Sequence, residues 1–296
     1  MGARLYLFLG IAFASLTNAQ PPFSWQWQNP LPQGNQLNAV RFVSDSTVVA
    51  VGNAGTVLRS QDGGQTWALL DSPTRNHLND IAVPLPGQAI AVGLLGTILR
   101  STDDGLHWEA IPTTFTDLLL SCDFARPDSG IISGFNGVLF ASSDSGLTWQ
   151  SLASPTSVAL WSLSMADARH AMAAGNNGIV IATGNGGQQW KVLSTPASSA
   201  LWAVWMLSPD TALTAGMDGV VYRTTTGGQS WQGIPLSGSL RGFYFQDVQN
   251  GLLVGSEGRM FRTTDGGQTW QPRPSSTSRW LYDVAISPSG ARAVAV

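Results

Sequence analysis

The stretch VGNAGTVLRSQDGGQTW, residues 51–67, decides the fold because the chain repeats it five more times. The later copies are VGLLGTILRSTDDGLHW (92–108), SGFNGVLFASSDSGLTW (133–149), AGNNGIVIATGNGGQQW (174–190), AGMDGVVYRTTTGGQSW (215–231) and VGSEGRMFRTTDGGQTW (254–270). The first glycines of successive copies are 41 residues apart, except for a final step of 39. A loop that occurs six times is more typical of a scaffold than of a catalytic site.

Each repeat predicts four short strands. In the second unit these are LNDIAV, QAIAVG, GTILRS and HWEAI, and the G-x-x-G between the second and third strands favours a tight hairpin. Four strands with a period near 41 are typical of a β-propeller blade, and such blades bury their faces against one another. The leucines that begin the units are Leu37, Leu78, Leu119, Leu160, Leu201, Leu240 and Leu281.

The sequence therefore predicts one all-β domain over 20–296, a seven-bladed propeller of four-stranded antiparallel blades. The repeats start near residues 37, 78, 119, 160, 201, 240 and 281. We expect the seventh blade to be composite, with an outer strand from 23–28 and two inner strands from 281–296, because such pairing closes the ring and removes open edges. Its third strand is missing, so we expect this blade to be incomplete and the natural chain to continue.

The turn between the third and fourth strands reads [Ser/Thr]-x-[Asp/Asn/Thr]-x-Gly-x-x-Trp. The short side chain can accept backbone N–H groups, the glycine can take a left-handed conformation, and the tryptophan can pack between sheets. A phosphate loop would need a following helix and a Lys-Ser/Thr pair, and a calcium loop would need more carboxylates. We predict no metal and no cofactor, and a structural role for Asp62, Gly64, Trp67, Asp103, Gly105, Trp108, Asp144, Gly146, Trp149, Asn185, Gly187, Trp190, Gly228, Trp231, Asp265, Gly267 and Trp270.

The first 19 residues predict a secretory signal peptide. Arg4 precedes an apolar run over 5–14, and small residues surround a cleavage site before Gln20. The run is too short for a convincing membrane span, and no later segment is apolar enough to cross, although a retained anchor helix is the alternative. We therefore expect a periplasmic, cell-surface or secreted protein. The net charge of −3 and the absence of a basic stripe argue against nucleic-acid binding, and the single Cys122 predicts a small buried side chain without a disulfide.

The units at 60–67, 101–108, 142–149 and 263–270 resemble the Asp-box, or bacterial neuraminidase repeat. The fuller unit at 51–67 and 254–270 is similar to the photosystem II stability and assembly factor family, and the resemblance covers about residues 23–296. It implies a seven-bladed propeller without enzymatic activity that holds partner proteins during assembly. The family's third-strand arginine maps to Arg59, Arg100, Arg223 and Arg262, whereas Ala141 and Ala182 replace it in two units. We expect these arginines to stack on tryptophans and to satisfy the turn rather than to bind a partner.

Sialidases share the Asp-box, so a carbohydrate-active or carbohydrate-binding propeller is the alternative function. Such enzymes place an arginine triad, a tyrosine nucleophile and acidic partners at the propeller centre. Tyr244 lies in a predicted inner strand without a nearby glutamate in sequence, Glu109 follows a box tryptophan, and Glu257 lies in a hairpin tip. The three histidines are scattered without metal or triad spacing. We predict no catalytic residues.

Positions that vary between repeats are the candidates for binding. The residue after each unit's leucine should line one mouth of the central channel, and in several units it is a residue type enriched in binding hot spots. These residues are Asn38, Asn79, Leu120, Trp161, Trp202, Arg241 and Tyr282, and packing between blades is their alternative role. Leu94, Leu95 and Phe135 occupy hairpin tips on the same face and should form an exposed apolar patch. We predict a protein or peptide partner, with a glycan as the alternative because tryptophan also stacks on sugars; the oligomeric state stays open.

Overall fold

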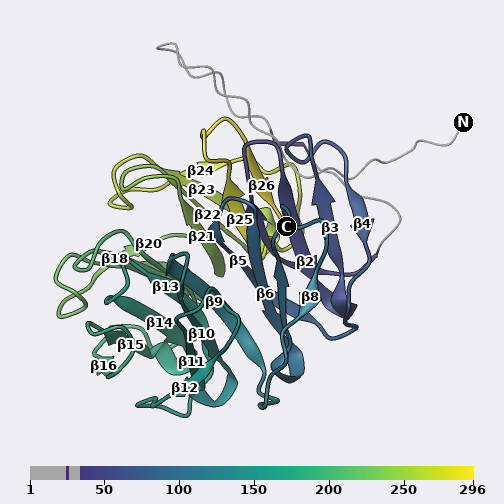
Figure 1. Cartoon of the computed structure of the whole chain (residues 1–296). Helices are drawn as coiled ribbons and strands as arrows, with labels where there is room; N and C mark the ends of the chain where they lie inside the picture. The colour runs from purple at the N-terminus through teal and green to yellow at the C-terminus, as the bar shows by residue number, and fades with distance from the viewer. Residues whose placement is uncertain (1–24, 27–33) are drawn as a thin grey trace, which may run out of the picture.

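The computed structural model describes residues 25–26 and 34–296. Within this part of the chain, six four-stranded antiparallel sheets and one two-stranded sheet follow one another around a ring (Figure 1). The first strand of each sheet contacts the first strand of the next, and the last sheet contacts both its predecessor and the first sheet. The predicted β-propeller of four-stranded antiparallel blades is therefore confirmed.

The strands follow the predicted order within each blade. Blade 1 contains β1 (Leu37–Phe42), β2 (Val48–Gly52), β3 (Val57–Ser60) and β4 (Ala68–Leu70). Blade 2 contains β5 (Leu78–Leu85), β6 (Gln88–Gly93), β7 (Ile98–Ser101) and β8 (Glu109–Ala110). Blade 3 contains β9 (Leu119–Arg126), β10 (Ser129–Gly134), β11 (Leu139–Ser142) and β12 (Gln150–Leu152).

The later blades have the same composition. Blade 4 contains β13 (Leu160–Met165), β14 (Ala171–Gly175), β15 (Val180–Thr183) and β16 (Lys191–Leu193). Blade 5 contains β17 (Leu201–Met206), β18 (Ala212–Gly216), β19 (Val220–Thr224) and β20 (Gln232–Pro235). Blade 6 contains β21 (Leu240–Phe245), β22 (Gly251–Gly255), β23 (Met260–Thr263) and β24 (Gln271–Arg273), and the two-stranded sheet contains β25 (Val284–Ile286) and β26 (Ala293–Ala295).

The G-x-x-G motif forms the hairpin between the second and third strands. In five blades it is a single 3₁₀ turn, at η1 (Asn53–Gly55), η2 (Leu94–Gly96), η3 (Phe135–Gly137), η4 (Asn176–Gly178) and η5 (Ser256–Gly258). The second glycine of the motif is required for two reasons. Gly55 has a left-handed backbone with φ +68°, and there is no room for a side chain because a Cβ would lie 2.1 Å from the carbonyl oxygen of Thr74. Substituting this glycine would therefore displace the chain that leads into the next blade.

A β-bulge follows the leucine at the start of every first strand in the six full blades. In blade 1, Leu37 pairs with Gly52 and Ala39 pairs with Val51, so Asn38 has no partner in the ladder. The same shift occurs in the other five blades. A bulge bends the strand and redirects the unpaired side chain. The predicted mouth residues of these blades are therefore bulge residues.

The core lies between the blades. Each cluster of buried side chains joins two neighbouring sheets, as where Val49 and Val57 of blade 1 pack with Ile81 and Leu99 of blade 2. Because the contact surface is shared, a single blade cannot bury its own apolar faces.

The sheet of β25 and β26 closes the ring between blade 6 and blade 1, where the two ends of the colour scale meet in Figure 1. Val284 and Ala293 pack against blade 6, while Ala285 and Val294 pack against blade 1. The predicted seventh four-stranded blade is not confirmed, because this sheet has two strands. Most of the outer strand expected at 23–28 lies outside the described residues, but Trp25 is buried in the cluster shared with β26.

Candidate functional site

In each Asp-box turn the side chain at the third position of the box accepts hydrogen bonds from backbone N–H groups of its own turn. In the first, Asp62 Oδ1 accepts the N–H groups of Gln65 and Thr66 at 2.8 and 2.9 Å, and Oδ2 accepts the Thr66 hydroxyl at 2.6 Å. The indole N–H of Trp67 donates to the carbonyl of Gly64 at 3.0 Å. Partial burial works against ionisation of Asp62, but these bonds outweigh it and lower the pKa of the carboxyl. The carboxylate is occupied by its own turn.

The predicted contacts of the third-strand arginines are partly confirmed. The Nε atoms of Arg59, Arg100 and Arg223 donate to carbonyl oxygens in the box turn of the following blade, at 2.8, 3.3 and 2.9 Å. The cation–π contacts found among residues 25–26 and 34–296 involve Arg41 and Arg241, and in this part of the chain Arg100 and Arg223 form none with tryptophan. These three arginines join one blade to the next.

The central channel contains a hollow of about 620 Å³. Its walls include every residue predicted for the mouth, namely Asn38, Asn79, Leu120, Trp161, Trp202, Arg241 and Tyr282. The hairpin tips of blades 1 and 4 reach this opening, because Asn38 Nδ2 donates to Asn53 Oδ1 at 3.1 Å and the indole N–H of Trp161 donates to Asn176 Oδ1 at 2.7 Å. The structure thus brings together, at one opening, side chains separated by up to 244 positions in the chain.

Arg241 lies at the centre of an aromatic cluster. Its guanidinium carbon is 4.8 Å from the ring centre of Trp202, 5.5 Å from Tyr282 and 5.7 Å from Trp161. Burial lowers the pKa of the guanidinium, an effect partly offset by Tyr282. Among the described residues, no carboxylate pairs with Arg241 and no oxygen accepts a hydrogen bond from it. The mouth therefore holds a cation without an acidic partner.

The two asparagines of the mouth have a structural role instead. Asn38 Nδ2 donates to the carbonyl of Leu78 at 2.8 Å, and Asn79 Nδ2 donates to the carbonyl of Leu119 at 2.7 Å. Each bond connects a blade to the start of the next. Leu120 is buried. The side chains available for a partner are thus concentrated on blades 4 to 6 and on the residues before β25.

The apolar hairpin tips are exposed as predicted for Leu95 and Phe135, whereas Leu94 is half-buried. Leu95 has a φ of +57°, a left-handed conformation that is uncommon for a leucine. Leu95 and Phe135 belong to neighbouring blades on the mouth face. Together they are consistent with an interaction surface.

Trp280 is a mouth residue that the sequence analysis missed. Its ring packs edge-on to Trp202 at 6.1 Å between centroids and stacks on Tyr282 at 6.2 Å. It directly precedes the leucine of the seventh repeat. The other six repeats have Gln36, His77, Leu118, Ala159, Ala200 and Ser239 at this position, so the change to tryptophan was the available signal.

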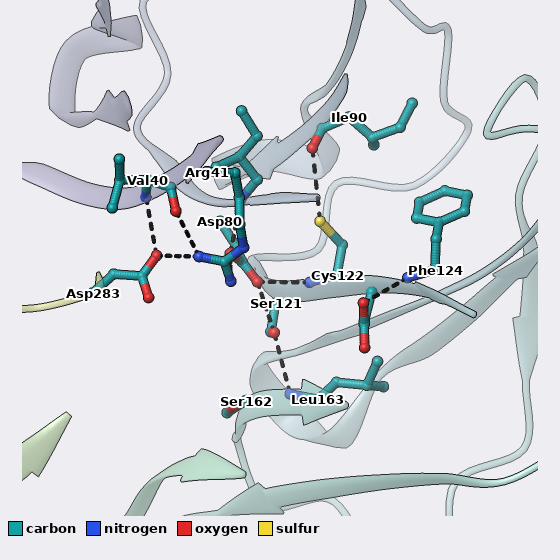
Figure 2. A network of polar contacts seen from close by, with 12 residues as sticks. Val40, Arg41, Asp80, Ile90, Ser121, Cys122, Phe124, Ser162, Leu163 and Asp283 are labelled. Carbon is teal, nitrogen blue, oxygen red and sulfur yellow. Dashed lines mark hydrogen bonds and ion pairs between the residues drawn. The ribbon is translucent and has the colours of Figure 1, made fainter. Parts of the chain in front are cut away.

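Deeper in the channel, polar side chains connect the inner strands (Figure 2). Asp283 Oδ2 accepts the backbone N–H of Val40 at 2.9 Å and forms an ion pair with Arg41. Asp80 Oδ2 accepts the Ser121 hydroxyl at 2.8 Å and the N–H of Cys122 at 3.0 Å. These acceptors satisfy backbone donors on the exposed edge of the neighbouring inner strand.

The titration of this network follows from its burial. Burial raises the pKa of Asp80 to about 6, although Arg41 and the bonds from Ser121 and Cys122 act in the opposite direction. Burial also lowers the pKa of Arg41, but Asp283 and Asp80 outweigh it and raise the pKa. Cys122 is buried as predicted, and burial raises its pKa, which makes the thiol unreactive. The sequence analysis did not identify this network.

Neither of the two glutamates in the chain belongs to the channel. Glu109 pairs with Arg100 at 3.4 Å, Glu257 pairs with Arg259 at 2.7 Å, and neither lines the hollow. Within residues 25–26 and 34–296, no group of three or more His, Cys, Asp or Glu side chains could hold a metal ion. In the same part of the chain, no helix is long and apolar enough to span a bilayer.

Comparison with protein families gives two matches. Residues 101–242 match the family described as Photosynthesis system II assembly factor YCF48, and residues 261–272 match the BNR/Asp-box repeat. The repeats in the matched segment are thus similar to those of the photosystem II assembly factor family. The resemblance inferred from the repeats is thereby confirmed. A comparison with curated protein sequences found no match.

Solved structures support the fold. A structure of YCF48 bound to a D1 peptide has a TM-score of 0.73 at 19% identity and covers 90% of this chain and 95% of its own. YCF48 from Cyanidioschyzon merolae has a TM-score of 0.70 at 20% identity, with the same coverage of both chains. A GH74 xyloglucanase from Xanthomonas campestris also matches, with a TM-score of 0.72 at 16% identity over 89% of this chain and 51% of its own. At these identities the likeness shows the propeller fold alone, which occurs in both binding proteins and enzymes.

Proposed function

We propose that this protein is a non-enzymatic scaffold that binds a protein or peptide partner through the mouth of its channel. The observation that carries the proposal is Arg241, which lies on the rings of Trp161, Trp202 and Tyr282 and has no acidic partner in the part of the chain that the structure describes. Arginine and large aromatic side chains gathered at one opening are the residue types that dominate binding energy at protein interfaces. The structure of YCF48 with a D1 peptide supports a peptide partner for a propeller of this kind.

The proposal also covers the part of the ring that the six four-stranded blades leave open. We propose that β25 and β26 are the inner strands of a seventh blade, with the segment at 23–28 as its outer strand. The burial of Trp25 beside β26 supports this arrangement. We also propose that residues 1–19 are a signal peptide, that residues 20–296 form one exported domain, and that the protein acts in the periplasm, at the cell surface or after secretion.

An array of random 15-residue peptides, probed with the purified domain, tests this function. The domain should bind a reproducible subset of peptides, and the double variant Trp202→Ala, Arg241→Ala should lose them while its melting temperature stays nearly unchanged. Both side chains lie at the mouth and not between blade faces, so we expect the fold to survive. An array that captures no peptide, or a double variant with unaltered binding, would defeat the proposal.

A carbohydrate-binding or sialidase-like propeller is the second candidate, because the mouth contains exposed tryptophan and the xyloglucanase shares the fold. A glycan array together with a fluorogenic sialoside assay separates the two functions. Glycan capture that depends on Trp202, or release of sialic acid, would favour this candidate over the peptide-binding scaffold.

A further inference from the structure

Arg241 lies between two exposed apolar side chains. Met217, at the hairpin tip of blade 5, is 53% exposed, and Trp280, before β25, is 42% exposed. The Met217 carbonyl accepts the hydroxyl of Ser239, two residues before Arg241, at 3.2 Å. On the other side, Trp280 packs on Tyr282, whose ring also contacts the guanidinium. The two elements on either side of Arg241, the hairpin tip of blade 5 and the segment before β25, therefore each carry an exposed apolar side chain.

The cation at the centre of this surface calls for an acceptor. A guanidinium has five N–H donors and no acceptor, and none of the described residues supplies an oxygen to Arg241. Stacking on aromatic rings covers its faces and leaves its N–H edge for hydrogen bonds. A carboxylate can accept two parallel N–H bonds from that edge, and the surrounding rings exclude water and strengthen the pair.

Apolar surface on both sides of the cation distinguishes two sources of a carboxylate. A chain terminus offers neighbouring residues on one side only, so it leaves Met217 or Trp280 uncovered. An acidic side chain within a continuous segment has neighbours on both sides. Resting on the proposed function, we propose that the mouth recognises an extended segment of a partner protein in which an internal aspartate or glutamate is flanked on both sides by large apolar residues.

Three synthetic peptides test this recognition. The first is acetyl-Leu-Phe-Glu-Leu-Phe-amide, the second replaces its glutamate by glutamine, and the third is acetyl-Leu-Phe-Gln with a free C-terminal carboxylate. Each is titrated into the ¹⁵N-labelled domain while the arginine Nε–H and tryptophan indole N–H resonances are followed. The internal acid should shift the resonances of Arg241, Trp202 and Trp280, and the glutamine peptide should bind about tenfold more weakly or worse, since a charged hydrogen bond is lost.

Variants of the protein complete the test. Arg241→Gln should abolish the preference for the glutamate peptide over the glutamine peptide. Met217→Ser should lower the affinity for the glutamate peptide but should leave this preference unchanged. Arg75→Gln is the matched control, because Arg75 is exposed beside the hairpin tip of blade 1 on the same face and its loss should change affinity less than twofold. Folding of each variant is checked by its melting temperature.

The outcomes separate this inference from the proposed function. The random array can capture peptides that the Trp202→Ala, Arg241→Ala variant no longer binds but that share no enriched acidic position. This result would support the scaffold function and overturn the proposed recognition of an internal acidic residue. Tighter binding of the free C-terminal carboxylate than of the internal glutamate would also overturn it. Failure of every peptide on the random array to bind would overturn the proposed function itself.

Discussion

Replacement of Asp283 by asparagine should weaken the closure of the ring. The Asp283 carboxylate joins the last sheet to blade 1 through the N–H of Val40 and the guanidinium of Arg41. Asparagine is nearly the same size and keeps an oxygen for Val40, so the substitution removes the charge with little change in packing. Arg41 then retains Asp80, whose carboxylate lies farther away at 3.8 Å.

The substitution lowers the free energy of unfolding because the Arg41 guanidinium stays in the channel with only its more distant partner, Asp80. Removing one partner of a buried ion pair costs about 3–5 kcal/mol, and the remaining Asp80 places the expected value near the lower end, about 3 kcal/mol. For a chain of this size, about 2–4 °C of melting temperature correspond to each kcal/mol, which gives a decrease of about 6–12 °C. Because Asp283 is nearly fully buried, solvent screening does little to reduce this effect.

Thermal unfolding followed by circular dichroism provides the assay, and Asp247→Asn provides the control. Asp247 accepts hydrogen bonds from Gln249 and Asn250 within its own exposed turn, so its loss should cost about 1 kcal/mol or less. The double variant Arg41→Met, Asp283→Asn should be less destabilised than the sum of its single variants, since no cation is left unpaired. A decrease for Asp283→Asn no larger than that for Asp247→Asn would refute the role of the ion pair in closure.

Three further predictions concern the box turns, the channel carboxylates and the hairpin tips. Asp62→Ala should lower the unfolding free energy by about 1–3 kcal/mol in urea titrations, and Thr226→Ala should cost less because threonine lacks the second carboxylate oxygen. Burial raises the pKa of Asp80 to about 6, so the protonated carboxyl stabilises the fold fully below about pH 4, and this stabilisation is lost as the pH rises through about 6. Asp80→Asn should therefore flatten the dependence of the unfolding free energy on pH between about 4 and 6. Leu95→Asn should raise stability by about 0.5–1 kcal/mol, because asparagine tolerates the left-handed backbone better, and should weaken peptide binding; lower stability would show that Leu95 is packed rather than available.

The repeat determines what could be predicted from the sequence. Local requirements recur in every unit: a glycine such as Gly55 needs space and a left-handed backbone, and a tryptophan such as Trp67 fills the gap between sheets. Six copies of the same requirements specify four strands per blade and their order. The same period places the residue after each leucine at one mouth, which is why the candidate ring around Arg241 could be predicted.

The remainder depends on contacts that no local pattern encodes. The partner of Arg41 is Asp283, 242 residues away, and the pair forms only because the ring closes. The β-bulge that redirects the mouth residues leaves no mark in the spacing of the leucines, and Trp280 lies two positions before Tyr282, the residue that the repeat predicted for the mouth. The predicted seventh blade also depended on a segment at 23–28 that the repeat itself does not contain.

Hydrogen exchange of the domain with and without a peptide selected from the random array tests the central claim most directly. The account predicts slower exchange in the mouth strands, at 201–206 and 240–245, and in the hairpin tips at 94–96 and 217–219, with unchanged exchange in the outer strands. Protection confined to the outer strands or to the Asp-box turns at the opposite end of the blades would contradict binding at the mouth.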